Sequence, residues 1–125
     1  MIKVLRLRSW NFHADNLDEM VRFYRDILGA ELRTTQTIAG VQVARLQLGG
    51  AGLGLFDASK QKLPGVPHHT FEIEGPSDPE ELVKELEASG VTVDGIRRYG
   101  SGRGYSVYVL DPSGNRLELS IGGPG

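Results

Sequence analysis

Hydrophobic and polar positions repeat with two different periods along the chain, and these periods predict its secondary structure. Residues 4–13 alternate as a strand does, with Trp10 and Phe12 on one face. The other face of this strand then carries three polar residues, Ser9, Asn11 and His13. Residues 15–29 have helical spacing instead, and the predicted buried stripe of the helix is Leu17, Met20, Val21, Tyr24, Ile27 and Leu28.

The second half of the chain repeats the order of elements found in the first half. After the first helix, the pattern predicts short strands at residues 31–38, 41–48 and 52–57. A strand at 68–74 and a helix at 78–90 follow, and then strands at 91–99, 104–110 and 116–121. The two helices align at an offset of about 61 residues, glycine matching glycine. We therefore predict one α+β domain over residues 1–125, built from two βαβββ modules at 1–63 and 68–122 with a link near 64–67.

Alternation also assigns the faces of the second module. One face of its first strand carries His69, Phe71 and Ile73, which we expect to pack beneath the helix. The opposite faces of its first and last strands carry polar side chains: His68, Thr70 and Glu72, and Arg116, Glu118 and Ser120. A polar face of this kind is common on half-exposed antiparallel sheets. Polar residues that converge from three strands also favour a ligand site.

Composition and charge exclude several classes of function. The net charge of the 125 residues is −2 and the charges are scattered, so we predict no nucleic-acid partner and no membrane surface. No apolar run approaches the roughly 20 residues that span a bilayer. Without cysteine there is no disulfide, zinc-thiolate site or thiol nucleophile. The start of the chain lacks a signal-peptide pattern, and we therefore expect a cytoplasmic location.

A glycine-rich stretch, "YGSGRGYS", lies between two predicted strands. It lacks the lysine and the helix start that a phosphate-binding loop requires. We predict a hairpin whose Arg103 and Tyr105 meet an anionic or aromatic ligand. The alternative is an exposed, flexible hairpin that contacts no ligand.

Three stretches taken together resemble one protein family. They are "NLDEMVRFYRDILG", "HHTFEIE" and "LDPSGNRLELS", and they occur in the order and at the spacing found in the vicinal-oxygen-chelate superfamily. That superfamily includes glyoxalase I, bleomycin-resistance proteins, fosfomycin-resistance transferases and extradiol dioxygenases. The resemblance implies a glyoxalase-like fold, in which the curved mixed sheets of two βαβββ modules surround a cavity for a divalent metal or a small ligand. It also implies a homodimer.

The resemblance further implies which residues would hold the metal. His68 and Glu118 match family ligands on the first and last strands of the second module, and Glu118 is also the expected catalytic residue. An imidazole and a carboxylate suit Fe, Mn, Zn or Ni, and a carboxylate with water suits Mg. The first module departs from the family pattern, because its two ligand positions carry Ser9 and Gly54.

Two functions follow from this partial match. The first is a metalloenzyme of lyase, isomerase, dioxygenase or transferase type that acts on a small oxygenated molecule. The second is a metal-free protein that binds and sequesters a drug or metabolite. In both, the expected ligand-binding residues are Ser9, Asn11, His13, Thr70, Arg103, Tyr105 and Arg116. His13 lies four residues from Ser9, about 13 Å along the strand, which favours a hydrogen-bonding role over metal ligation.

Overall fold

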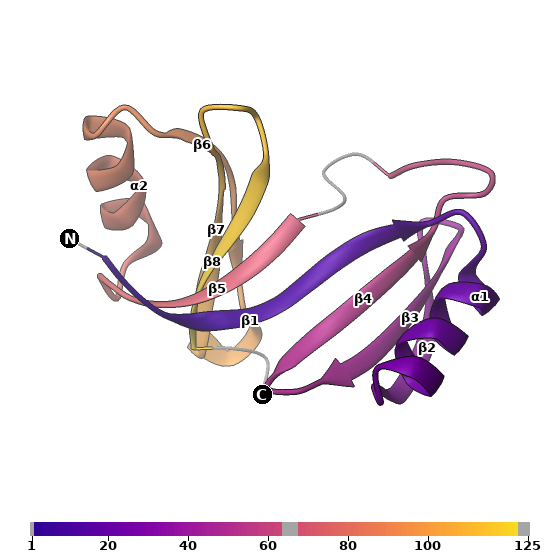
Figure 1. Ribbon diagram of the computed structural model, residues 1–125. Coiled ribbons are helices and arrows are strands. Elements are labelled where there is room, and N and C mark those ends of the chain that lie inside the picture. Colours follow the sequence, from indigo (N-terminus) through magenta and orange to yellow (C-terminus); the bar gives the residue numbers. More distant parts are fainter. Residues whose placement is uncertain (1, 64–67, 123–125) are drawn as a thin grey trace. The chain divides into compact units, whose positions relative to one another are not determined.

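The computed structural model describes residues 2–63 and 68–122, and its elements follow the predicted order (Figure 1). The first set consists of β1 (Lys3–Ala14), α1 (Leu17–Arg22), β2 (Glu31–Ile38), β3 (Val41–Leu48) and β4 (Ala51–Asp57). The second set consists of β5 (His68–Glu74), α2 (Pro79–Ala88), β6 (Thr92–Arg98), β7 (Gly104–Leu110) and β8 (Arg116–Gly122). The predicted α+β class and the βαβββ order are thus confirmed, while the predicted link at 64–67 lies outside the described residues.

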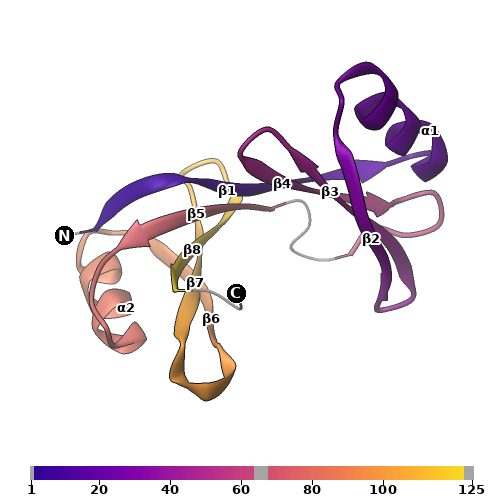
Figure 2. The same ribbon diagram turned by 90° about the horizontal axis from the view of Figure 1, so that it is seen from below.

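The chain divides into two compact units, and β1 contributes to both of them. One unit is Arg8–His68, in which the strands are hydrogen-bonded in the order β2-β3-β4-β1. In this unit β1 runs parallel to β4, whereas the pairs β2–β3 and β3–β4 are antiparallel. The sheet is therefore mixed. The other unit combines Met1–Leu7 with His69–Gly125, and its order is β1-β5-β8-β7-β6 (Figure 2).

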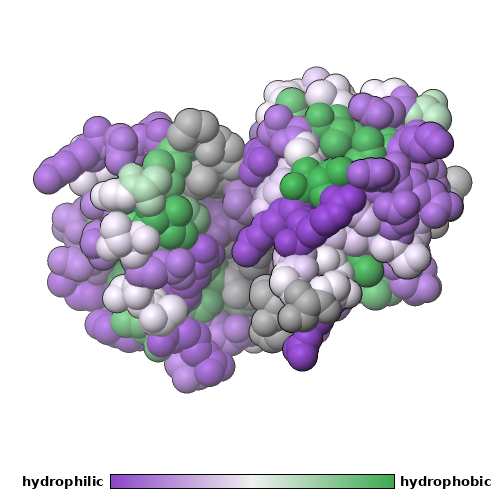
Figure 3. All heavy atoms as spheres, turned by 180° about the vertical axis from the view of Figure 1, so that it is seen from behind, coloured by the Kyte–Doolittle hydropathy of each residue, from purple (hydrophilic) through white to green (hydrophobic). Residues whose placement is uncertain are grey.

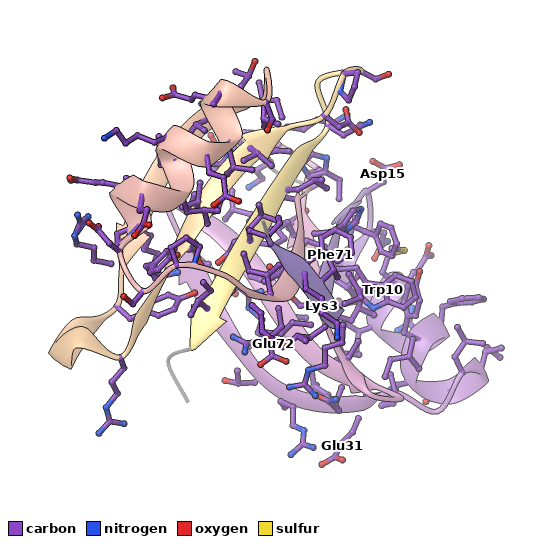
Figure 4. All side chains as sticks on the ribbon, turned by 90° about the vertical axis from the view of Figure 1, so that its left-hand side faces the viewer. Lys3, Trp10, Asp15, Glu31, Phe71 and Glu72 are labelled. Atoms are coloured by element: carbon purple, nitrogen blue, oxygen red, sulfur yellow. The ribbon has the colours of Figure 1, made fainter. Side chains whose placement is uncertain are left out.

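The core of the Arg8–His68 unit lies between α1 and one face of its sheet. Its buried members come mainly from β3 and β4: Ala30, Ala44, Leu46, Leu53 and Leu55. Trp10 and Phe12 of β1 pack against this cluster, as the alternation of the sequence predicts. Figure 4 shows Trp10 on the part of β1 that runs toward α1. The opposite face of the strand is thereby left for Ser9, Asn11 and His13.

The first helix departs from the prediction in its second half. Asn16 caps α1 as expected, accepting a hydrogen bond from the backbone N–H of Glu19 at 3.1 Å. From Phe23 to Ile27, however, the chain forms a π-helical turn. This wider turn rotates the following residues away from the helical stripe. Ile27 and Leu28, predicted to be buried, are instead 69% and 49% exposed.

The core of the second unit lies between α2 and the strands β5, β7 and β8. Its fully buried centre is Leu82 of α2, surrounded by Ile73, Tyr105, Val107, Val109 and Leu119. Phe71, Leu117 and Ile121 pack against this cluster, so the predicted helix-side faces of β5 and β8 are confirmed. Figure 4 shows Phe71 and Glu72, successive residues of β5, pointing in different directions. Glu72 pairs with Arg6 at 2.7 Å, away from this core.

The turn between β7 and β8 is fixed by one carboxylate. Asp111 accepts hydrogen bonds from the backbone N–H groups of Ser113 and Asn115 at 2.9 and 2.8 Å, and another from the Asn115 side chain. These hydrogen bonds hold the pKa of Asp111 below its usual value. They set the register of the hairpin that carries Glu118 on β8.

No helix in residues 2–63 or 68–122 is long and apolar enough to cross a membrane. On the face drawn in Figure 3, hydrophobic residues form patches that hydrophilic residues interrupt.

Candidate functional site

A buried carboxylate, Glu118, marks the polar face of the second unit. It lies on β8, is 8% exposed, and faces away from the helix-side core. The hydroxyl of Thr70 donates a hydrogen bond to its Oε1 atom at 3.0 Å, and the hydroxyl of Ser106 donates to its Oε2 atom at 2.6 Å. Hydrogen bonds to a charged acceptor are among the stronger ones in proteins. Glu118 is therefore held from both sides, by strands β5 and β7.

Two further hydroxyl groups extend this arrangement into a chain. Tyr99 lies between β6 and β7, and its hydroxyl is hydrogen-bonded to the hydroxyls of Ser106 and Ser120, the latter at 2.9 Å. All five side chains of this group are buried or nearly so. We call it the Glu118 cluster: Thr70, Tyr99, Ser106, Glu118 and Ser120. A satisfied polar network of this kind fixes the position of its carboxylate.

Tyr108 and Arg116 flank the Glu118 cluster on the same face. Tyr108 is the cross-strand neighbour of Glu118, and the guanidinium carbon of Arg116 lies 4.0 Å from the centre of the Tyr108 ring. Arg116 also pairs with Asp94 of β6 at 2.9 Å. Burial raises the pKa of Tyr108, the Glu118 carboxylate raises it further, and Arg97 and Arg116 act in the opposite direction.

Replacing Glu118 with glutamine is expected to lower the pKa of Tyr108, because one of the two causes that raise it is removed. Tyr105 supplies an internal control, since its pKa is raised by burial and by Asp78, Glu81 and Glu85 rather than by Glu118. An NMR titration of the tyrosine ring carbons resolves the two groups. A Tyr108 titration that is the same in wild type and in Glu118→Gln would contradict the charge coupling.

The raised pKa of Tyr108 also makes the free energy of unfolding depend on pH. A phenol whose pKa is higher in the folded than in the unfolded state binds its proton more tightly when folded. The stability contributed by Tyr108 is thus fully present below its unfolded pKa, near 10.0, and is lost as the pH rises through the folded value. In Glu118→Gln this alkaline loss should occur at lower pH.

The glycine-rich hairpin places its two expected ligand-binding residues differently. Arg103 is exposed, next to the short 3-10 turn Gly100–Gly102. Tyr105 is 3% exposed, belongs to the helix-side core, and donates its hydroxyl to the backbone oxygen of Pro76 at 2.5 Å. It lies on the opposite face of β7 from Ser106, so the structure does not bring Tyr105 together with Glu118.

In the Arg8–His68 unit, three residues form one row across the face opposite α1, a face that also carries a buried apolar cluster of Val41, Val43 and Phe56. Asn11 of β1 is paired in register with Gly54 of β4, and Gly54 is paired with Arg45 of β3. Asn11 is 2% exposed; its amide nitrogen donates to the backbone oxygen of His68 at 2.5 Å. Its Oδ1 atom accepts a hydrogen bond from Nη1 of Arg45 at 3.4 Å.

The side chains of Asn11 and Arg45 occupy the space next to Gly54 that the side chain of any other residue would need. A Cβ atom at residue 54 would lie 2.2 Å from Oδ1 of Asn11 and 2.8 Å from Nη1 of Arg45. The equivalent atom at Gly52 would lie 3.5 Å from Cβ of Ser9, an ordinary contact. At this position the family sometimes has a glutamate or glutamine, whereas here the amide of Asn11 and the guanidinium of Arg45 fill the space.

Three more residues of this unit are expected to bind a ligand or a metal: Ser9, His13 and His68. Ser9 and His13 are both half-buried and flank Asn11 on β1. Nε2 of His13 is buried and has no hydrogen-bond partner within residues 2–63 or 68–122. His68 begins β5 and is half-buried.

Sequence reasoning missed four residues that the structure adds to these faces: Arg45, Tyr99, Ser106 and Tyr108. Alternation could have found three of them. In "GYSVYVL", Ser106 and Tyr108 occupy the face opposite Tyr105 and Val107, and in "VARLQ", Arg45 stands opposite Ala44 and Leu46. Tyr99 follows the end of a strand, where no period assigns its direction.

A resident divalent metal at the four family positions does not fit these residues. Within the described ranges, no three His, Cys, Asp or Glu side chains gather closely enough to hold a metal ion. The Gly54 position holds the amide of Asn11 and the cationic Arg45, and a guanidinium repels a metal cation.

A comparison with known protein families shows to which of them the chain belongs. The model of the glyoxalase/bleomycin resistance protein/dioxygenase superfamily matches residues 9–119. The chain belongs to this superfamily. Its βαβββ order is the scaffold of a superfamily with several activities, so the fold does not by itself fix one function.

Two curated members of the superfamily are similar in sequence. The glutathione transferase FosA of Serratia marcescens is 31% identical over 112 residues, which cover 86% of this chain and 74% of that protein. The metallothiol transferase FosB of Shouchella clausii is 27% identical over 120 residues, covering 93% and 80% of the two chains.

Solved structures support the same fold. The methylmalonyl-CoA epimerase of Mycobacterium tuberculosis superposes with a TM-score of 0.69 at 20% identity, covering 97% of this chain and 90% of its own. A variant of the Streptomyces coelicolor enzyme, in complex with 2-nitronate-propionyl-CoA, gives a TM-score of 0.66 at 23% identity, with coverage of 96% and 99%. At these identities the likeness concerns the fold alone.

Proposed function

We propose that this protein binds a small oxygenated organic molecule through buried and half-buried polar side chains, using hydrogen bonds and charge rather than a resident divalent metal. The observation that carries the proposal is the row of Asn11, Gly54 and Arg45, in which an amide and a cation occupy a position that the family pattern gives to a metal ligand. Ser9, at the other such position, is a poor metal ligand at neutral pH.

The Glu118 cluster supports the same proposal from the second unit. Thr70 and Ser106 hold the Glu118 carboxylate in one orientation, which prepares it as an acceptor for a hydroxyl, an N–H or a proton of the ligand. Preorganised acceptors lose little freedom when a ligand binds. In this proposal Ser9, Asn11, His13, Thr70 and Arg116 contribute polar contacts, and a homodimer is the expected assembly.

A ligand screen with and without chelator tests the proposal. Candidate ligands are small carboxylates, phosphonates and glutathione, and the measurement is the midpoint of thermal unfolding. A ligand at about one hundred times its Kd stabilises a protein by about 2.7 kcal/mol. We expect this stabilisation to be the same with EDTA and with added Mn²⁺. Stabilisation that appears only with a divalent cation would contradict a metal-free function.

A metal-dependent enzyme is the second candidate, and one observation favours it. His68 and Glu118 carry ligand-type side chains at two positions that match the family pattern. One relative is named a metallothiol transferase and another a glutathione transferase. In this candidate His68 and Glu118 would hold a divalent ion whose other ligands come from water or substrate. Bound metal that is lost in both His68→Ala and Glu118→Ala would mark it.

A further inference from the structure

A pocket of about 310 Å³ lies on the helix side of the sheet in the Arg8–His68 unit. Its apolar lining consists of Leu17 and Val21 of α1, Leu32 of β2 and Ala44 of β3. This volume is at the lower end of the range for small-molecule sites. Ala44 belongs to the core beneath α1, so the pocket lies on the opposite face of the sheet from the row that contains Gly54.

The π-helical turn after α1 leaves this pocket partly uncovered. In a regular helix, Ile27 and Leu28 would continue the buried stripe. The turn at Phe23–Ile27 instead directs both side chains to solvent, where they are 69% and 49% exposed. The strand β2 is the edge of the sheet and lacks their cover, so its apolar residue Leu32 is 38% exposed.

An irregularity in β2 brings two of its side chains to the pocket. The register with β3 shifts between Leu32 and Thr34. Leu32 is paired with Leu46, and Thr35 is paired with Ala44. Leu46 and Ala44 both pack in the core beneath α1, so their cross-strand neighbours project to that side as well. A shift of this kind re-aims side chains and is common next to functional sites.

Charged side chains of the helix complete the lining of the pocket. They are Asp18, Arg22 and Arg25. Arg25 is paired with Asp26 at 3.0 Å. The Arg22 side chain has no ion pair or hydrogen bond within residues 2–63 and 68–122, although Asp18 precedes it by one helical turn. Arg22 is therefore the cationic group of this lining that is placed to meet an anion.

We propose that this pocket is a second binding site, which takes a small amphiphilic carboxylate. The hydrocarbon chain would lie on the apolar lining, which it removes from water, and the carboxylate would pair with Arg22. A guanidinium presents N–H donors in a fork that matches the two oxygens of one carboxylate. The proposal is independent of the function proposed above, because it concerns the helix side of the sheet.

Hexanoate is the probe that tests this site on the intact chain. Acetate carries the carboxylate without the chain, and hexanol carries the chain without the charge. The readout is the NMR shift of the methyl signals of Leu17, Val21 and Leu32 at constant ionic strength. We expect hexanoate to bind about tenfold more tightly than acetate. We expect it to bind about twofold to fivefold more tightly than hexanol, the range for an exposed ion pair.

Two neighbouring threonines provide a matched pair of variants. Thr35→Phe should fill the pocket from an exposed strand position that suits an aromatic residue, and should weaken hexanoate and hexanol by about tenfold or more. Thr34→Phe is the control, since Thr34 is paired with Arg45 and projects to the opposite face. We expect it to change either affinity by less than about twofold.

Arg22→Gln separates the charge from the chain. It should weaken hexanoate by about twofold to fivefold and leave hexanol unchanged. Arg33→Gln is its control, because Arg33 is exposed on β2, lies outside the lining and pairs with Glu31 at 3.6 Å. We expect no measurable change of hexanoate affinity in this control. Should Thr35→Phe fail to fold, the comparison of the two arginine variants still tests the site.

Four outcomes would overturn the proposal. They are no shift of the methyl signals with hexanoate, equal losses in the two threonine variants, equal weakening of hexanoate by Arg22→Gln and Arg33→Gln, and an Arg22→Gln that weakens hexanol as much as hexanoate. Methyl signals that move with protein concentration in the absence of probe would assign the pocket to a second copy of the chain and would also overturn it. The metal-free function has its own test in the ligand screen with EDTA, so the two can fail separately.

Discussion

Replacing Gly54 with alanine is expected to destabilise the protein by about 1–3 kcal/mol, because the new methyl group forces Asn11 and Arg45 apart. Asn11 is buried and short, so it cannot move without weakening its hydrogen bond to His68. A buried amide that loses its hydrogen-bond partner destabilises the folded state, because no water replaces the lost hydrogen bond. The free energy of unfolding, from urea denaturation, measures the effect.

Gly52→Ala is the matched control for this prediction. Gly52 and Gly54 are two residues apart on β4, so their side chains would project from the same face. At Gly52 the added methyl group meets only an ordinary contact, and we expect a change below about 0.5 kcal/mol. In an Asn11→Ala background the cost of Gly54→Ala should shrink, since the closest atom is gone. Equal effects at the two glycines would contradict the packing described for the row.

Replacing Ser106 with alanine should destabilise the second unit by about 1.5–3 kcal/mol, the range for a hydrogen bond to a charged group. Ser106 is fully buried and donates to Glu118 Oε2 at 2.6 Å. Without it, one oxygen of a buried carboxylate loses the donor that Ser106 supplies, and the hydroxyl of Tyr99 loses its hydrogen bond to Ser106. The loss should be visible in the free energy of unfolding at neutral pH.

A surface serine and a double-mutant cycle make this prediction specific. Ser113 lies exposed in the turn before β8, and we expect Ser113→Ala to change stability by less than about 0.5 kcal/mol. Ser106→Ala and Glu118→Gln should be non-additive, because they remove the same interaction. If the two changes simply add, or if Ser106→Ala is as mild as Ser113→Ala, the Glu118 cluster does not hold its carboxylate as described.

Strand alternation was the most reliable guide to this protein. The face that buries Phe71 and Ile73, and the opposite face that carries Thr70 with Glu118, both follow from a period of two. The period is enforced physically, because a slip of one residue would bury the polar set. The same rule would have placed Arg45 and Ser106 correctly.

The sequence could not predict features that depend on an irregular backbone conformation or on the register between neighbouring strands. The π-helical turn at Phe23–Ile27 changes the rotation per residue, so a regular helical pattern places Ile27 and Leu28 on the wrong side. The role of Gly54 depends on which residue of β1 lies beside it in register. Tyr105 was expected at a ligand because of its glycine-rich neighbours, although its strand position turns it toward the helix-side core.

Metal content tests most directly the proposal that this superfamily member holds its ligand without a resident divalent metal. Protein purified without chelator is exposed to Mn²⁺, Zn²⁺, Ni²⁺, Fe²⁺ or Mg²⁺, freed of excess ion, and analysed by mass spectrometry for metal per chain. We predict substoichiometric metal in wild type, and no difference from His68→Ala or Glu118→Ala. One tightly held divalent ion per chain, absent from both variants, would contradict the claim.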